Sequence, residues 1–307
     1  MTDATMPATS LSMLLDGLID YAGLYPPASL PMADMVADWA RGLGSEHDWM
    51  LGRLIVPVSG LDEFESEAST LLPVDPDEDP WVLSALMSSG DDIPLESQID
   101  RILKFNDAHC SDGHGDAVID VVELRASSPR AIESSLDLLP EELFPFFELD
   151  LDNDIRGLLA SIVGSDAGAK IRTGGIRPDL YPDADSLADF IIQCARADVP
   201  FKATAGLHHP LRNHNDSIDA MQFGFLNVFL AALLASDEEA TPDRLRSLLT
   251  RGDLTGIEFR SDGVAIDGEQ YGLDEIEDVR IAFALSFGSC SFDEPVEDLI
   301  ALGLLPQ

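Results

Sequence analysis

The segments "GAKIRTGG" (residues 168–175) and "PFKATAGL" (residues 200–207) flank the pattern "DADSLADFIIQCARA" (residues 183–197). Each flanking segment is a short apolar run that ends in glycine, which is typical of a strand in a buried sheet. The central segment places apolar residues three and four positions apart, which indicates an amphipathic helix. A strand, a helix and a second strand in this order predict one βα unit of a parallel sheet.

The same alternation continues on both sides of this unit. Helical patterns separate most of eight candidate strands, which cover residues 18–24, 51–58, 81–87, 117–124, 144–151, 168–174, 200–207 and 255–261. Eight such units predict an α/β fold of the (β/α)8 TIM-barrel type, which leaves no open sheet edge. An open doubly wound sheet is the alternative. No GxGxxG follows the first strand, which disfavours a dinucleotide-binding version of that sheet.

The length of 307 residues fits one barrel domain. We expect a flexible tail at residues 1–9 and a single domain over residues 10–307, because no segment has the composition of a linker. The stretch after residue 271 predicts extra C-terminal helices, broken at "SFGSCSFDEP" (residues 286–295) and packed across one end of the barrel.

The composition is strongly acidic. Asp and Glu number 57 against 18 Lys and Arg, which gives a formal net charge of −39. Such a surface indicates adaptation to high salt, where screening removes the repulsion between like charges. It also argues against nucleic acid and against an anionic membrane surface as partners, since both need basic residues on the protein.

The cysteines and the N-terminal residues indicate a cytoplasmic protein. The three cysteines are far apart and form no CxxC, which suggests free thiols in a reducing compartment. The first ten residues lack the pattern of a signal peptide. The most apolar stretch (residues 223–235) is too short to span a bilayer, so it predicts a helix buried on most sides. A neighbouring subunit could cover this helix, which would make the protein a homo-oligomer.

Charged residues gather near the ends of the candidate strands, where barrels carry their functional sites. Because side chains alternate along a strand, these residues form pairs that share a face. The pairs are Lys170 with Arg172, Lys202 with Thr204, Glu123 with Arg125, Glu148 with Asp150, and Glu258 with Arg260. One interpretation is a structural network of ion pairs in the barrel mouth. The other is a binding or catalytic site.

The lysines favour the second interpretation. The chain has only three, and Lys170 and Lys202 both stand in predicted strands, whereas Lys104 fits a surface helix. Lysine is the cation whose pKa falls most readily beside another cation or away from water, and a neutral amine can form a Schiff base with a carbonyl compound. Lys170 could therefore be a nucleophile, a binding site for an anion, or one half of a structural ion pair.

A lysine on strand six followed by Thr-Gly, and a second lysine on strand seven followed by Gly, resembles deoxyribose-phosphate aldolase and its class I aldolase relatives. The resemblance covers mainly residues 117–207. It implies a carbon–carbon lyase in which Lys170 forms the Schiff base, Lys202 tunes its pKa, and Asp120 in "VIDVVEL" relays protons. Glu148 and His208 are further candidates for moving protons.

We expect the substrate to be a small anionic carbonyl or sugar-type compound. Tyr25, beside Pro26 and Pro27, suggests a rigid lip that could cover the bound molecule. The complete set of predicted binding residues is Tyr25, Glu123, Arg125, Arg172, Thr173, Gly174, Gly175, Thr204, Glu258 and Arg260.

Two other functions remain open at this point. A metal-assisted lyase or hydrolase could use His208 or His209 with Glu123 and Glu148, although no HxH, HExxH or CxxC motif supports a metal and we predict no required cofactor. A non-catalytic barrel could bind a small anion through its cations alone. Cys290 stands in a Gly-Ser stretch without a GxSxG motif, which favours a turn over a nucleophile.

Overall fold

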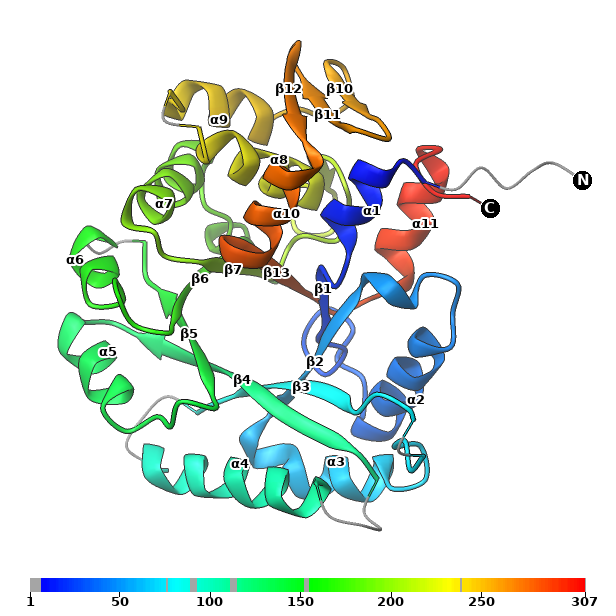
Figure 1. The fold of residues 1–307 in the computed structure, drawn as a ribbon, viewed down its shortest axis with the longest axis vertical. Helices are drawn as coiled ribbons and strands as arrows, with labels where there is room; N and C mark the ends of the chain where they lie inside the picture. The colour runs from blue at the N-terminus through cyan, green and yellow to red at the C-terminus, as the bar shows by residue number, and fades with distance from the viewer. Residues whose placement is uncertain are drawn as a thin grey trace, which may run out of the picture.

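Eight parallel strands close into a barrel at the centre of the molecule (Figure 1). The structure is a computed structural model and describes residues 7–75, 77–88, 93–110, 115–151, 155–237 and 239–306. The closed barrel confirms the predicted (β/α)8 fold. Around the barrel the strands are β1 (Ile19–Tyr21), β2 (Leu51–Pro57), β3 (Trp81–Leu86), β4 (Ala117–Ala126), β5 (Phe144–Leu149), β6 (Gly168–Arg172), β7 (Phe201–Thr204) and β13 (Ala284–Ser289).

Helices connect consecutive strands and form the outer ring in Figure 1. They are α2 (Met32–Leu43), α3 (Leu61–Ala68), α4 (Leu95–His109), α5 (Pro129–Leu136), α6 (Ile155–Ala160) and α7 (Ala184–Ala197), with α11 (Asp293–Ala301) after β13. Short 3-10 helices η1 (Asp48–Met50), η2 (Val58–Gly60) and η3 (Pro178–Leu180) lie in the loops. Helix α1 (Thr9–Leu15) precedes β1 and begins inside the expected tail, of which residues 1–6 lie outside the described residues.

Helix α7 shows how the sequence specifies these connections. The Asp183 carboxylate accepts a hydrogen bond from the Ser186 backbone N–H and caps the helix, and Asp198 ends it in the left-handed conformation. Between the caps, Leu187, Phe190 and Ile191 share the buried face. The spacing of the apolar residues therefore gives both the helix and the side that packs on the barrel.

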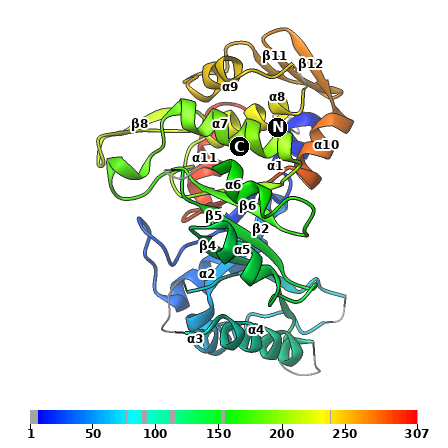
Figure 2. The same ribbon diagram turned by 90° about the vertical axis from the view of Figure 1, so that its left-hand side faces the viewer.

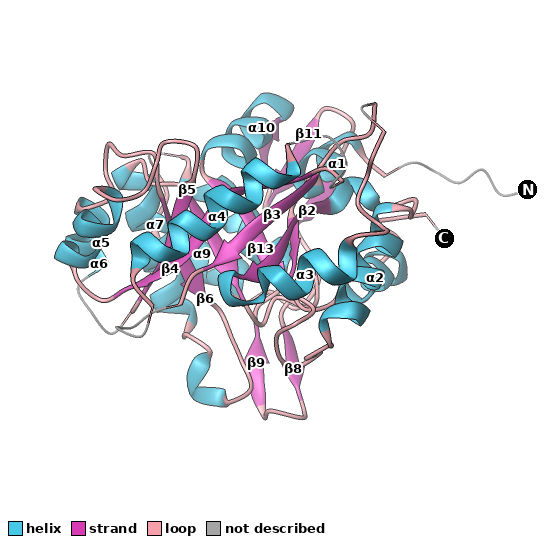
Figure 3. Ribbon diagram, turned by 90° about the horizontal axis from the view of Figure 1, so that it is seen from below, coloured by secondary structure: helices cyan, strands magenta, loops and turns pink. Residues whose placement is uncertain are grey.

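A long insertion separates β7 from the last barrel strand. It contains the hairpin β8 (Asn213–Asn215) and β9 (Ala220–Gln222), the helices α8 (Phe225–Ala235), α9 (Pro242–Leu249) and α10 (Leu273–Ala282), and an antiparallel sheet of β10 (Ile257–Phe259), β11 (Gly263–Ile266) and β12 (Glu269–Gly272). In Figure 2, β8 projects away from the helices, and α9, β11 and β12 lie together at the top. Figure 3 shows the hairpin and β11 at opposite ends of the molecule.

The prediction of the eighth strand was wrong. Residues 255–261 form β10 of the small antiparallel sheet, and β13 closes the barrel between β7 and β1. The segment "ALSFGS" of β13 is rich in Gly and Ser, which indicates a turn in a single sequence. Here the small residues fit a crowded barrel interior: a Cβ on Gly288 would lie 3.3 Å from both Ile55 Cδ1 and Thr204 Oγ1. Extra helices do follow residue 271, but α10 and α11 are separated by a barrel strand.

Helix α8 is buried along its whole length within one chain. It packs against α7, α9, α10 and β13, and the Phe225 and Phe287 rings stack with centroids 5.2 Å apart. Its apolar composition is therefore explained by contacts inside the chain, and the expected subunit interface on this helix is not needed. In the part of the chain that the structure describes, no helix has the length and apolar character needed to cross a membrane.

Candidate active site

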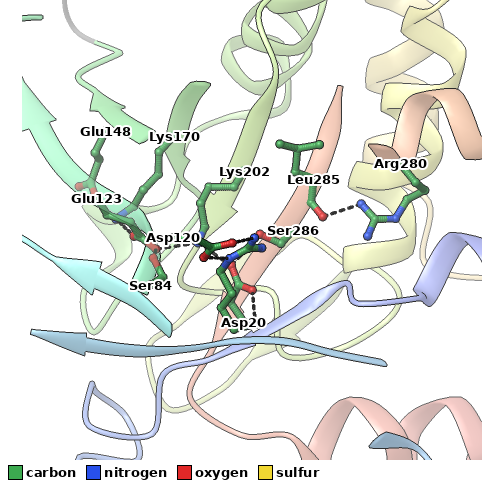
Figure 4. Close-up of polar contacts among 11 residues, drawn as sticks. Asp20, Ser84, Asp120, Glu123, Glu148, Lys170, Lys202, Arg280, Leu285 and Ser286 are labelled. Atoms are coloured by element: carbon green, nitrogen blue, oxygen red, sulfur yellow. Dashed lines mark hydrogen bonds and ion pairs between the residues drawn. The ribbon is translucent and has the colours of Figure 1, made fainter. Parts of the chain in front are cut away.

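Lys170 on β6 and Lys202 on β7 lie side by side inside the barrel. The two residues are direct partners in the register between these parallel strands. Their exposed fractions are 3% and 0%. The two lysine-bearing strands therefore bring these residues together, and Figure 4 shows both amines pointing toward the same group of carboxylates.

The Glu123 carboxylate joins the two lysines. Its Oε2 accepts a hydrogen bond from Lys170 Nζ at 2.6 Å, and its Oε1 accepts one from Lys202 Nζ at 2.6 Å. Lys202 Nζ also lies 2.5 Å from Asp20 Oδ2, and Lys170 Nζ lies 3.0 Å from Glu148 Oε2. Two ammonium groups thus face three carboxylates, which allows charge to be buried because every charge has an opposite partner.

Hydroxyl and backbone groups donate further hydrogen bonds to two of these carboxylates. Ser84 Oγ donates to Glu123 Oε1 at 2.8 Å, and Ser286 Oγ donates to Asp20 Oδ2 at 2.7 Å. The Arg53 backbone N–H donates to Asp20 Oδ1 at 2.8 Å. Gly52 makes room for Asp20, because a Cβ there would lie 2.6 Å from Asp20 Oδ1. The network therefore holds both carboxylates in one orientation.

The network favours the charged form of its members. Burial opposes the charge on Glu123, but the two lysines outweigh burial and hold its pKa far below the usual range. Burial also opposes the charge on Lys202, yet Asp20 and Glu123 raise its pKa. The pKa of Glu148 is lowered, since Lys170 and Arg172 outweigh its burial. The nearby Lys170 cation therefore does not lower the pKa of Lys202, because Glu123 lies between the two amines.

A cavity of 470 Å³ lies above this network. Lys170 lines the cavity, whereas Lys202 is fully buried between Asp20 and Glu123. Lys170 is therefore the lysine that a bound molecule can contact. Other predicted residues that line the same cavity are Tyr25, Glu123, Arg125, Glu148, Arg172, Gly175, Thr204 and His208.

Two arginines flank Glu148 at the cavity. Arg125 Nε lies 3.3 Å and Arg172 Nε 3.2 Å from the same Glu148 Oε1. Both arginines also line a neighbouring hollow of 760 Å³. The Arg125 side chain is 65% exposed and that of Arg172 34%. Their positive charge can therefore reach an anionic group that enters from solvent.

Tyr25 contributes a polar group to the apolar side of the cavity. Its hydroxyl is buried and has no hydrogen-bond partner among the described residues. Burial, and to a smaller extent the charge of Glu123, raise the pKa of this hydroxyl, which therefore stays neutral. A bound molecule could supply the missing partner.

Several predicted binding residues have other positions. Thr173 is fully buried, and its hydroxyl donates to the Thr204 carbonyl at 3.3 Å and also to the Ala205 carbonyl. Gly174 allows the loops after β6 and β7 to approach, since a Cβ there would lie 2.8 Å from Gly206 Cα. Glu258 on β10 and Arg260 just after it form an exposed pair with each other at 2.6 Å. Their predicted place in the barrel is wrong because β10 is not a barrel strand.

Asp120 has a different partner from the one expected. Arg53 binds its carboxylate through Nε at 2.7 Å and Nη2 at 2.6 Å, whereas both lysine amines bind Asp20, Glu123 or Glu148. The pairing of β3 with β4 shifts register at this point, so that Ser84 pairs with Val121 rather than with Asp120. This irregularity changes the alternation along β4. Glu123 therefore takes the place beside the lysines that the resemblance gave to Asp120.

The residues of the predicted metal site do not come together in the described part of the chain. His209 Nδ1 pairs with Asp298 Oδ2 at 2.5 Å, and His208 turns to Glu294 and Cys290 rather than to Glu123 or Glu148. Among the described residues, no group of three or more His, Cys, Asp and Glu side chains could hold a metal ion.

The roles of Asp20, Ser84, Ser286 and Cys290 were missed by the sequence analysis. Asp20 had a usable signal, because it is an acid within the otherwise apolar "LIDYAGL". The serines had none, since isolated serines are common in strands and turns. Cys290 was read as part of a turn, but the structure places it after β13 in the cavity wall.

His208 forms an ion pair at the edge of the cavity. Its Nδ1 lies 3.2 Å from Glu294 Oε2 and 3.9 Å from Cys290 Sγ. Burial opposes a charge on the ring, but contacts with Cys290 and Glu294 outweigh burial and raise the pKa of His208 from 6.5 to about 9. The ring is therefore an imidazolium at neutral pH.

This ion pair predicts a stability that depends on pH. Because the folded-state pKa of about 9 exceeds the unfolded value of 6.5, the stabilisation is complete below pH 6.5 and is lost as the pH rises through 9. We expect His208→Gln to lower the free energy of unfolding by on the order of 2 kcal/mol at pH 6, allowing for screening at the half-exposed Glu294. Urea unfolding of both proteins should show this difference shrinking toward pH 9.5. A difference that stays constant with pH would contradict the assigned charge.

No protein-family model matches this chain, no curated protein is significantly similar to it, and no solved structure matches it.

Proposed function

We propose that this barrel is a carbon–carbon lyase of the class I aldolase type, in which Lys170 forms a Schiff base with a small anionic carbonyl compound. The single observation that carries the proposal is the position of Lys170. Lys170 and Lys202 lie side by side and both bind Glu123, but of the two lysines Lys170 is the one that lines the cavity. Such an amine can meet the carbonyl carbon of a molecule bound in the cavity.

The neighbours of Lys170 supply the proton transfers of this reaction. Its ammonium group must first lose a proton, and Glu148 Oε2 at 3.0 Å lines the same cavity and can accept it. The free amine then adds to the carbonyl carbon, the carbonyl oxygen takes up protons and leaves as water, and a C=N bond remains. The protonated imine then accepts the electron pair of the bond between the α and β carbons of the substrate, while the hydroxyl on the β carbon loses its proton to a base and becomes a carbonyl group.

The other members of the site have positioning roles in this scheme. Lys202 keeps Glu123 ionised and in place, so it acts through Glu123 rather than as a neutral amine. Arg125 and Arg172 provide the positive charge for an anionic substituent of the substrate. Tyr25 can bind a substrate hydroxyl through its unpartnered oxygen.

The test is reductive trapping with borohydride in the presence of pyruvate, dihydroxyacetone phosphate or glycolaldehyde phosphate. The chain has only three lysines, so peptide mapping assigns each adduct without ambiguity. We expect an adduct on Lys170, and none on Lys170→Arg, because a guanidinium does not form this imine. The matched control is Lys104→Arg, which changes an exposed lysine of α4 and should leave the adduct in place. No adduct across the panel, or equal labelling of Lys104, would overturn the proposal.

A second function is favoured by the ion pairing of both lysines. If Lys170 remains an ammonium group, the cavity with Arg125 and Arg172 becomes a binding site for a small anion without chemistry. Thermal stabilisation by glycolaldehyde phosphate, together with the absence of any trapped adduct, would support this function instead. In either case we place the protein in the cytoplasm, because its three cysteines are free thiols.

A further inference from the structure

A second group of reactive side chains borders the cavity. Cys290, after β13, and His208, in the loop after β7, both line the cavity that contains Lys170. We propose that Cys290 and His208 form a thiolate–imidazolium pair, and that the Cys290 sulfur binds small aldehydes covalently as a thiohemiacetal. This nucleophile is separate from the Lys170 amine and does not depend on Schiff-base formation.

The contact of His208 with Glu294 favours a proton on Nδ1. An ionised carboxylate can only accept hydrogen bonds, so Nδ1 must carry the proton where it meets Glu294 Oε2 at 3.2 Å. The interaction with His208 is the largest cause that keeps the pKa of Glu294 lowered. Cys290 Sγ lies 3.9 Å from the same Nδ1. The sulfur therefore faces the imidazole nitrogen that would protonate the oxygen of an adduct.

Cys290 combines a charged neighbour with access to a cavity. It is 7% exposed, and this exposure faces the space that a ligand would occupy. Cys110 is exposed on the outside, where its thiol donates to the Asn106 carbonyl of its own helix at 2.8 Å. Cys194 is fully buried in α7, and burial raises its thiol pKa. The chain thus contains two internal controls for the reactivity of Cys290.

Two titratable groups, His208 and Tyr21, interact with Cys290, and a third, Glu294, contacts His208. His208 comes from the loop after β7, Glu294 from α11, and Tyr21 from β1, where Asp38 accepts a hydrogen bond from the Tyr21 hydroxyl at 2.9 Å. Burial and Asp38 raise the pKa of Tyr21, so this residue stays neutral. The Glu294 charge is offset by the His208 imidazolium that it contacts. The His208 imidazolium is therefore the cation that the sulfur contacts.

The covalent step needs no further reactant. The thiolate sulfur adds to the aldehyde carbon, and a C–S bond forms while the π electrons of the C=O bond move to oxygen. The resulting alkoxide takes a proton from the His208 imidazolium, which becomes a neutral imidazole. No group leaves and nothing is oxidised, so the reverse reaction regenerates the starting pair.

The first experiment measures alkylation of all three cysteines by iodoacetamide at pH 7, followed by peptide mass spectrometry. We expect Cys290 to react at least as fast as exposed Cys110 despite its burial, and His208→Gln to slow Cys290 by about tenfold or more without changing Cys110. Cys194 should stay unmodified in both proteins, which shows that the variant remains folded. A Cys290 that reacts more slowly than Cys110, or that is indifferent to His208→Gln, overturns the pair.

The second experiment tests the aldehyde adduct in the Lys170→Met variant, which cannot form an imine at this position. Glycolaldehyde should protect Cys290 from iodoacetamide in this variant, whereas ethylene glycol, which lacks the carbonyl group, should not. Protection in the natural protein that disappears in Lys170→Met would instead assign the carbonyl to Lys170. That outcome would overturn the thiohemiacetal and support the proposed Schiff base, so the two proposals fail separately.

Discussion

Glu123→Gln is expected to lower the free energy of unfolding by about 3–5 kcal/mol, the cost of breaking a buried ion pair by removing one partner. Glu123 is 1% exposed and receives a hydrogen bond from each of two buried lysines. A neutral amide leaves Asp20 as the one remaining carboxylate on Lys202 and Glu148 as the one remaining on Lys170. The measurement is urea unfolding of both proteins at pH 7.

Asp120→Asn provides the matched control for this variant. Asp120 stands three residues earlier on β4 and is also bound by a cation, Arg53, but its side chain is 38% exposed. Water can solvate the charge left behind, so we expect a loss of about 1 kcal/mol or less. Equal losses in the two variants would mean that burial of the lysine network is not the source of its energetic importance.

Potassium chloride is expected to stabilise the protein strongly. The net charge of −39 repels itself in the folded chain, and added salt screens this repulsion. Raising the concentration from 0.1 to 2 M should increase the free energy of unfolding by about 2 kcal/mol or more, which corresponds to a rise in Tm of roughly 3 °C or more for a chain of 307 residues. Differential scanning calorimetry over a series of concentrations measures the effect.

The Glu123→Gln variant provides a comparison for the salt experiment, because its change lies in the buried lysine network and not on the acidic surface. Buried pairs are screened far less than surface charges, so the Glu123→Gln variant should show the same rise of Tm with salt from a lower starting point. Chloride is preferable to sulfate, because sulfate also strengthens apolar burial and would mix two effects. A Tm that stays level or falls with potassium chloride would show that the acidic surface is not adapted to salt.

Most of the barrel could be predicted from the sequence because seven strands are apolar runs followed by amphipathic helices. The eighth could not, since β13 has small residues at Ser286, Gly288 and Ser289 that resemble a turn. The size of Gly288 is set by side chains from strands that are far away in the sequence, such as Ile55 and Thr204. Tertiary packing of this kind has no signature within a short window of sequence.

The candidate site, like the barrel, could be predicted from the sequence only in part. The meeting of Lys170 and Lys202 follows from strand order, because consecutive parallel strands place equivalent residues side by side. The choice of Glu123 over Asp120 depends on an irregularity in the pairing of β3 with β4, which alternation alone does not show. The contact of His208 with Cys290 joins two loops that are far apart in the chain, so its discovery required the fold.

The burial of Lys170 and Lys202 leaves Lys104, exposed on α4, as the one lysine of three on the outer surface, where reagents too large to enter the cavity can reach it. Amine-directed dyes, crosslinkers or resin couplings would then engage lysine at a single point on the outer ring of helices. The protein could be tethered to a support in one orientation, with its central chamber untouched by the coupling chemistry.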